Sequence, residues 1–372
     1  MWNLLKMNFI IEKLSKKNIV AFLFVAVLVI GLAVYMENED VGNLVAEKTA
    51  EHQNLIAAVN QYQVLDATEE SDSSDIYKNI VQQKKLVALQ RAATNMDRPD
   101  LFVDSAIELA ELRKNSFNLE GYEDVAIYLP TKTENELEMI FYDHLKELDF
   151  PIFTDSLSFY QFLIFLFVIL GSFWYIFLAF FTSGIMIDDF RHTSLIKGYP
   201  ILFNQYITAK GLSTIVIIFV LIIELFLCSL PLIFIRGLGD ASYPVAVFDG
   251  NFEIYLIVQY IGICLLYMIC IGVFVILLSI ILNVLLKNMY LTLFVQLFLY
   301  VIPLIYPRII SLLPYNPFNY MNFTSLLSGQ SLDLAYPVVL NANYGLITIV
   351  ISSLLMVIAI RLFLSAGKLK RV

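Results

Sequence analysis

The stretch IYLIVQYIGICLLYMICIGVFVILLSIILNVLL (residues 254–286) decides the class of fold, because its 33 residues include no charged side chain. A straight helix of this length would span about 50 Å, whereas the hydrocarbon core of a bilayer is about 30 Å thick. We therefore expect a membrane-spanning helix that tilts strongly, breaks near Gly262 or Gly272, or extends beyond the bilayer on its inner side.

The rest of the composition also indicates a membrane protein. Of the 372 residues, 59% are hydrophobic and 15% are charged, and the mean hydropathy is +0.74. A soluble domain has about a quarter charged residues. Apolar runs long enough to cross a bilayer occur at 19–36, 157–181, 212–235, 254–286, 289–307 and 345–364. These runs predict an all-α membrane protein with six transmembrane helices.

The distribution of lysine and arginine predicts the orientation of the spans. With the amino terminus inside, the inner segments and span ends carry 12 Lys and Arg, while the short outer loops carry only Arg236 and Arg308. Short inner loops of membrane proteins are enriched in these residues. We expect a multi-pass protein of the cell membrane with both termini cytoplasmic, its first span (19–36) serving as an uncleaved anchor.

Segment 37–155, between the first two spans, is predicted to be an extracellular helical domain. It contains 25 Asp and Glu against 10 Lys and Arg, a net charge of −15, so the remainder of this chain of net charge −9 carries +6. An acidic outer domain together with a basic inner face suits anionic lipid of the inner leaflet and argues against nucleic acid. The acidic domain could gather basic cargo such as a cationic peptide, or its charge could simply keep it soluble.

Local signals divide this domain into helices. Apolar residues recur at helical spacing over 41–62, and serines stand ready to cap a helix over about 76–93. Pro99 suits the first turn of a third helix. Thr133 and Glu136 have the spacing of a capping box for the last one.

Two further segments flank the membrane core, 156–372. Residues 1–18 predict a helix in the inner interface with its apolar side in the acyl boundary, or alternatively a frayed basic tail that only orients the first span. Residues 311–330 contain prolines that exclude one continuous helix and aromatics that suit the headgroup level. We expect a short re-entrant helical element there, on the outer side.

The stretch SGIMIDDFRHTSLIKGYPILFNQYITAK (183–210) joins the second and third spans and is unusually charged for this chain. Its apolar side chains can face lipid or the protein, and Gly198 and Pro200 end a short helix. The side chains that can then face the cytosol are Asp188, Asp189, Arg191, His192 and Lys197. A short rigid element of this kind can dock in a partner and pass a motion to its two spans.

This stretch resembles the signature of ABC-2-type transporter permeases, in which an acid and an arginine precede a Gly-Thr pair, a leucine-rich step, a proline, an arginine and then a lysine at the next span. The matching residues are Asp189, Arg191, Thr193, Leu195, Pro200 and Lys210, while His192 stands where glycine is usual and Asn204 near where arginine is usual. The order of the elements is also similar, apart from 37–155, which would be an insertion.

The resemblance implies that the chain is a permease subunit of an ATP-binding cassette exporter. It would pair with a second permease subunit and with separate ATPase subunits, which bind the ATP and magnesium. The implied contact is the coupling element 184–210, through Asp188, Asp189, Arg191, His192, Thr193, Leu195, Lys197, Pro200 and Lys210. The alternative is a connector whose charges only follow the positive-inside pattern.

Polar residues inside the spans are few. A carboxylate at the bilayer centre costs about 3 kcal/mol on insertion scales, so Glu224 would line a dimer interface or cargo path, or contact Gln259 or Tyr260 of the next helix. Asn283 and Gln296 are expected to form hydrogen bonds between helices.

Catalytic chemistry has no support in the sequence. We find no phosphate-binding loop, nucleophile elbow or zinc-protease motif, and the three histidines have no zinc-ligand spacing. We expect no enzyme activity and no cofactor on this chain. The rival to the exporter is a membrane binding or immunity protein that captures an extracellular ligand through 37–155 without transport.

Overall fold

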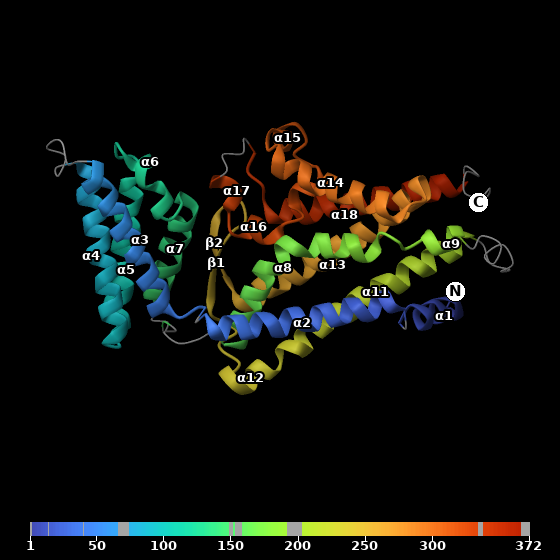
Figure 1. Ribbon diagram of the computed structural model, residues 1–372, viewed down its shortest axis with the longest axis horizontal. Helices are drawn as coiled ribbons and strands as arrows, with labels where there is room; N and C mark the ends of the chain where they lie inside the picture. Colours follow the sequence, from blue (N-terminus) through green and yellow to red (C-terminus); the bar gives the residue numbers. More distant parts are fainter. Residues whose placement is uncertain are drawn as a thin grey trace.

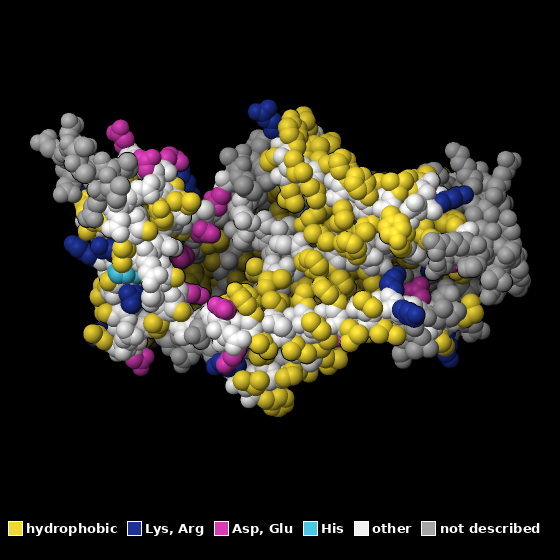
Figure 2. Space-filling view, viewed as in Figure 1, with side chains coloured by type: hydrophobic (Ala, Val, Ile, Leu, Met, Phe, Trp, Pro, Cys, Tyr) yellow, Lys and Arg dark blue, Asp and Glu magenta, His cyan; other side chains and the backbone are white. Residues whose placement is uncertain are grey.

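The computed structural model describes residues 2–13, 15–39, 41–65, 74–148, 152, 158–191, 203–333 and 338–365. Figure 1 shows a bundle of long helices with a smaller helical domain at one end, and both ends of the chain lie at the other end. We call these the domain end and the terminal end of the bundle. In Figure 2 hydrophobic side chains cover most of the bundle, while acidic ones gather on the helical domain and where it meets the bundle.

Five helices are long and apolar enough to cross a membrane. They are α2 (Lys16–Asn38), α8 (Phe159–Thr182), α11 (Phe203–Ser229) with its continuation α12 (Pro231–Arg236), α13 (Ile257–Leu286) and α18 (Ala342–Ser365). A shorter apolar helix, α14 (Met289–Ile305), lies where the fifth span was predicted. Its 17 residues extend about 26 Å, and Pro303 lies in its last turn. The chain is therefore a multi-pass helical membrane protein with five candidate spans in its described residues.

Helix α13 is the centre of the bundle and contacts α8, α11, α14 and α18. Its contact with α8 includes a hydrogen bond from Trp174 Nε1 to the carbonyl of Met268, at 3.0 Å. On the other side of α8, the ring of Tyr175 stacks on that of Tyr300 in α14, with centroids 4.9 Å apart. Buried aromatic side chains thus hold the central helices together.

The amino terminus begins with α1 (Trp2–Lys13), which packs along α11. Ser15 caps α2, and the buried Asn18 donates through Nδ2 to the carbonyl of Glu12 at 2.5 Å. These bonds fix the turn between α1 and α2, so the predicted helix over 1–18 is two helices meeting at a capped corner.

A β-hairpin corrects the all-α prediction. Strands β1 (Pro244–Phe248) and β2 (Phe252–Leu256) pair antiparallel, from Pro244 opposite Leu256 to Phe248 opposite Phe252. Their β-branched and aromatic residues favour strands, and Gly250 takes the left-handed conformation (φ 85°) that the tight turn requires. The hairpin contains the start of the predicted fourth span, so α13 begins at Ile257 and is 30 residues long.

The helical domain follows α2. Its elements are α3 (Leu44–Leu65), α4 (Asp75–Asn95), α5 (Pro99–Ser116), α6 (Tyr122–Val125), η2 (Ala126–Tyr128) and α7 (Lys132–Leu148). Ser74 caps α4 and Pro99 opens α5, as predicted. The capping box lies two residues earlier than predicted, because Thr131 and Glu134 exchange the reciprocal hydrogen bonds at the start of α7.

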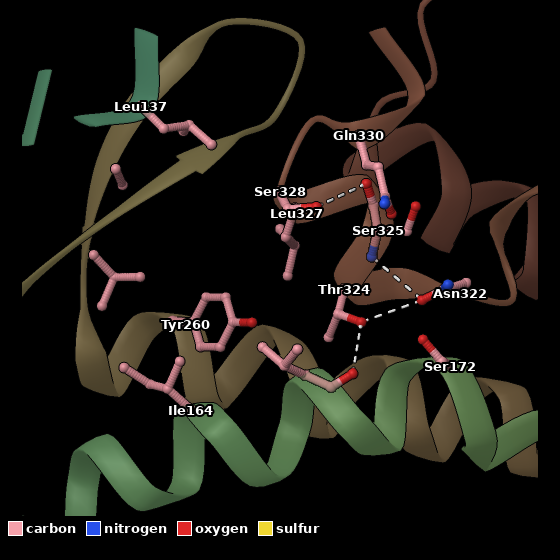
Figure 3. Close-up of a pocket in the computed structure, with 13 residues that line it drawn as sticks. Leu137, Ile164, Ser172, Tyr260, Asn322, Thr324, Ser325, Leu327, Ser328 and Gln330 are labelled. Carbon is pink, nitrogen blue, oxygen red and sulfur yellow. Dashed lines mark hydrogen bonds between the residues drawn. The ribbon is translucent and has the colours of Figure 1, made fainter. Parts of the chain in front are cut away.

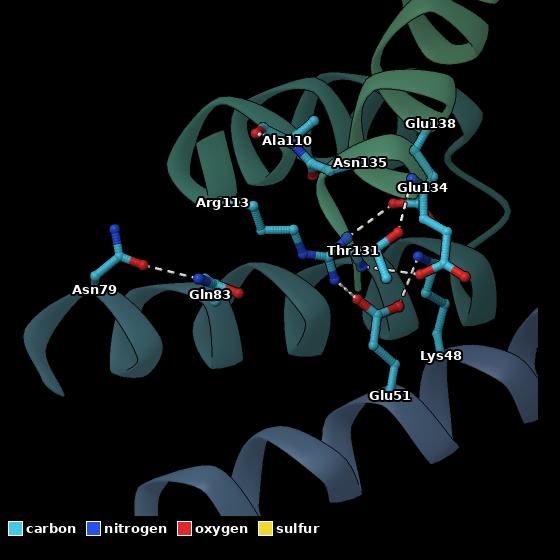
Figure 4. Close-up of polar contacts among 10 residues, drawn as sticks. All are labelled: Lys48, Glu51, Asn79, Gln83, Ala110, Arg113, Thr131, Glu134, Asn135 and Glu138. Carbon is cyan, nitrogen blue, oxygen red and sulfur yellow. Dashed lines mark hydrogen bonds and ion pairs between the residues drawn. The ribbon is translucent and has the colours of Figure 1, made fainter. Parts of the chain in front are cut away.

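A buried charge cluster crosses the helical domain (Figure 4). Arg113 of α5 is only 2% exposed and forms ion pairs with Glu51 of α3 and Glu138 of α7. Lys48 bonds the other oxygen of Glu51 at 2.7 Å. Beside these charges, the side-chain amide of Asn135 donates to the carbonyl of Ala110 at 2.9 Å. Buried charges are tolerated when they are paired in this way, so the cluster fixes how the three helices meet.

The domain sits on the membrane bundle through α7, which packs against the hairpin and α17 (Gln330–Asp333). Thr133 donates its hydroxyl to Asp333 at 2.7 Å, and the rings of Phe141 and Tyr243 meet edge to face at 6.0 Å. Thr133, predicted to be a cap, is therefore a contact between the domain and the bundle.

The segment before the last span is a chain of short helices, as its prolines predicted. These are α15 (Arg308–Leu312), η3 (Pro317–Tyr320), α16 (Phe323–Leu327) and α17. Helix α16 packs on α8, where Thr324 donates to the carbonyl of Val168 at 3.3 Å and lies against Gly171. Val168 is about 14 Å along α8 from Phe159, so α16 reaches well into the bundle.

Candidate functional site

The structure describes only part of the predicted coupling element. His192, Thr193, Leu195, Lys197 and Pro200 lie outside the described residues, and the side chains of Asp188 and Arg191 are not described. The described part is the turn after α8, the short helix α9 (Ile187–Arg191) and the start of α11. These segments lie at the terminal end of the bundle (Figure 1).

Asp189 is the centre of this region. Its carboxylate accepts from Lys210 Nζ at 2.6 Å and from the hydroxyl of Tyr206 at 2.8 Å. The side chains of Asp189 and Lys210 are 10% and 14% exposed. Asp189 therefore faces α11, contrary to the expectation that it faces the cytosol. The reason is physical, because a carboxylate enclosed by helices is stable only with a partner, and Lys210 supplies it.

The amino-terminal helices place two more charged side chains near the Asp189–Lys210 pair. Burial raises the pKa of Glu12 in α1, although the charges of Lys17 and Lys210 act to lower it. Lys17, at the start of α2, lies 4.6 Å above the ring of Phe181 near the end of α8. Helices α1, α2, α8 and α11 therefore meet the predicted coupling element at one point.

A second contact ties α9 to the opposite side of the bundle. Lys287, in the turn between α13 and α14, lies 5.9 Å from the ring of Phe190. Gly184 faces Met289, where an added Cβ would be 3.2 Å from the sulfur, so the turn after α8 runs close to the start of α14. We call the contacts of Asp189, Phe190 and Gly184 the α9 joint. A displacement of α9 would be passed both to α11 and to the α13–α14 turn.

Below the joint, a buried polar cluster connects α8, α13 and α14. Ser279 shares hydrogen bonds with Thr182 and Gln296, both at 2.6 Å, and Asn283 donates to the carbonyl of Ser183 at 2.8 Å. This confirms the prediction that Asn283 and Gln296 bond between helices. Thr182 and Ser279 could not be predicted as partners from the sequence, since small hydroxyl residues are common on membrane spans and do not indicate what they bond to.

Glu224 has neither of the predicted partners among the described residues. It is partly buried on α11, and its Oε2 is enclosed without a hydrogen-bond partner in the described chain. Gln259 instead accepts from the backbone of Leu256 and caps α13.

Groups able to hold a metal are absent from the described part, where His, Cys, Asp and Glu form no cluster of three or more. The α9 joint consists of charged and aromatic side chains that contact one another.

Comparison of the chain with protein-family models, with curated proteins and with solved structures finds no match in any of the three. The class of protein therefore has to be taken from the sequence and structure of this chain alone. It is a multi-pass helical membrane protein that carries a helical domain at one end of its bundle and a charged joint at the other.

Proposed function

We propose that this chain is the transmembrane permease subunit of an ATP-binding cassette exporter, moved by separate ATPase subunits that dock on 184–210. The permease would act as a homodimer or heterodimer in the cell membrane. The terminal end would be cytoplasmic and the helical domain extracellular. A peptide, a drug or a lipid would each suit as cargo.

The α9 joint is the observation that carries this proposal. A motor that hydrolyses ATP outside the membrane can move helices only through a stiff contact. The ion pair between Asp189 and Lys210 provides one, because both side chains are largely buried and well bonded. The joint also lies at the end that holds both termini and is far from the helical domain (Figure 1).

The joint divides the predicted contact residues into two roles. Asp189 and Lys210 are bonded to each other, so we assign them to transmission between α9 and α11. Docking is then assigned to the other charged residues of the same stretch, of which Lys197 is one. This division refines the sequence prediction, which gave all of them the same role.

Site-specific photocrosslinking in native membranes tests the proposal. A photoreactive residue at Lys197 should crosslink to a polypeptide that is itself labelled by a photoreactive ATP analogue. The control position is Ile127 in the helical domain, which is 86% exposed and should give no such adduct. If folded protein crosslinks to no ATP-binding polypeptide at Lys197, or to equal amounts at both positions, the proposal is wrong.

A second measurement distinguishes the transmission role of Lys210 from the docking role of Lys197. Lys210→Met should leave the Lys197 crosslink in place but abolish the ATP-dependent change in hydrogen exchange of α11. A non-transporting binding protein would instead lose function when the helical domain is removed and would show no ATP-dependent exchange in either variant.

A further inference from the structure

A groove of roughly 270 Å³ lies at the domain end, where five parts of the chain meet. Figure 3 shows its walls, formed by α8, the hairpin, the start of α13, the segment 322–330 and Leu137 from α7. It lies at the opposite end of the bundle from the α9 joint, so the two are separate sites.

The walls of the groove differ in polarity. Ile164 and Val168 of α8 and Val245 of β1 form an apolar wall. The facing wall carries hydroxyl and amide groups, including Thr324 and Asn322, which bond to each other at 3.2 Å. None of the described residues that line the groove is charged. An ionic group would find no partner inside it, so the surroundings select an uncharged and largely apolar occupant.

The groove opens toward the side of the bundle. Ile164, Val168 and Ser172 follow one another at four-residue steps along one face of α8, and Val168 is 48% exposed. Ser172 lies about 20 Å along the helix from Phe159. Because α8 is a candidate span, the lower part of the groove is continuous with the surface that faces hydrocarbon, and its upper part reaches the helical domain.

We propose that the groove binds one acyl chain of a membrane lipid. The chain would enter from the bilayer along α8 and pack on the apolar wall, with its ester group among the hydroxyl and amide groups near Ser325 and Ser328. The volume lies just below the range of about 300–1,000 Å³ that holds a whole drug-sized ligand, and so suits one chain. Since Leu137 closes the upper end, the bound chain would touch both α8 and the helical domain.

Lipid binding in the groove requires only that α8 lies in a bilayer and does not require that the chain transports a substrate. The bound lipid would be a structural link between the membrane bundle and the helical domain.

Lipid photolabelling of the full chain in nanodiscs tests the inference. The probe is phosphatidylcholine with a diazirine near the middle of one acyl chain. Leu327 is 2% exposed and Tyr260 is 5% exposed, so the annular lipid cannot reach either side chain. Adducts on these two residues are expected, above the background at Leu221, which is fully buried on α11 outside the groove.

Two variants that fill the groove make the test specific. Val168→Trp and Ala246→Phe should each lower the adducts on Leu327 and Tyr260 by about fivefold or more, the change that a loss of roughly 1 kcal/mol in binding gives. The control is Leu355→Trp, on the outward face of α18, which should leave them unchanged. Hydrogen exchange of α7 reports whether each variant remains folded.

The outcomes either support or overturn the inference. Adducts at Leu327 that fall in either folded groove variant support it. Adducts no higher than those at Leu221, or adducts unaffected by both variants, overturn it. Labelling of the groove by a soluble photoreactive peptide, with none by the lipid, would also overturn it.

Discussion

Replacing Arg113 by methionine should loosen the helical domain far more than the same change at the adjacent Lys114. Methionine keeps an apolar stem of similar length but removes the guanidinium that pairs with Glu51 and Glu138. Lys114 pairs with Glu136 at 3.0 Å, with side chains 54% and 32% exposed, so it provides a matched control on the same helix. The comparison isolates the effect of burial on an ion pair.

The magnitude follows from the exposure of each partner. Removing one member of a buried ion pair costs about 3–5 kcal/mol. Glu138 is 39% exposed and can be hydrated once Arg113 is lost, and Glu51 keeps its bond to Lys48. We therefore expect a cost at or just below the lower limit of that range, about 2–3 kcal/mol for Arg113→Met. An exposed pair is worth about 0.2–1 kcal/mol, which sets the expectation for Lys114→Met.

Hydrogen exchange with mass spectrometry, on the full chain in nanodiscs, measures the effect within the domain. A loss of 2–3 kcal/mol corresponds to a roughly 30- to 150-fold fall in protection of the α5 and α7 amides, since 1.36 kcal/mol is a factor of ten. Lys114→Met should lower it by less than about fivefold. If Arg113→Met loses no more protection than Lys114→Met, the buried cluster does not hold the domain together as we argue.

Three further predictions concern other contacts. Gly171→Ala should lower the thermal unfolding temperature because its Cβ would overlap Thr324 of α16. Gly262 has open space around it, so Gly262→Ala should leave that temperature unchanged or raise it slightly. Equal shifts in the two variants would contradict the close packing of α16 on α8. Asp189→Asn should destabilise the purified protein by about 2–4 kcal/mol because Lys210 would lose its ion pair while remaining largely buried. Restoration of wild-type stability in the double variant Asp189→Asn, Lys210→Met would confirm the pairing, whereas additive losses would exclude it. Burial raises the pKa of Glu51, but the charges and hydrogen bonds of Lys48 and Arg113 outweigh burial, so the net pKa is lowered. The ionised Glu51 therefore stabilises the fold above pH about 4.3, and this stabilisation disappears as the pH falls through the lowered pKa. The difference in stability between wild type and Glu51→Gln should shrink over the same pH interval, and a difference that grows on acidification would refute the sign.

Much of the membrane architecture is predictable from the sequence because long apolar runs have few alternatives to spanning helices. Each of the six predicted runs corresponds to an apolar helix, although α14 is shorter than a typical span. The hairpin was missed because residues 254–256 continue the apolar run of α13, and composition alone does not reveal where a strand becomes a helix. Strand pairing depends on a partner segment, here 244–248, that lies outside the run.

The details of the candidate site were harder to predict, because they depend on which side chains meet. Charge and the family resemblance placed Asp189 and Lys210 in one candidate coupling element but did not indicate that they bond to each other. The capping box shows the same limit. The sequence TKTENE offers two threonine–glutamate pairs at the required spacing, and the contact of Thr133 with Asp333 decides between them.

The hydrogen bonds among Thr182, Ser279, Asn283 and Gln296 restrict how this membrane body can rearrange. In an apolar medium a broken bond finds no water to replace it, so sliding any of α8, α13 and α14 past the others is penalised at several points together. These three helices should therefore travel as one rigid block. Motion would then be concentrated at the edges of that block where α2 and α11 meet it, because α18 is bonded to α13 through the hydroxyl of Tyr267 and the carbonyl of Ala342.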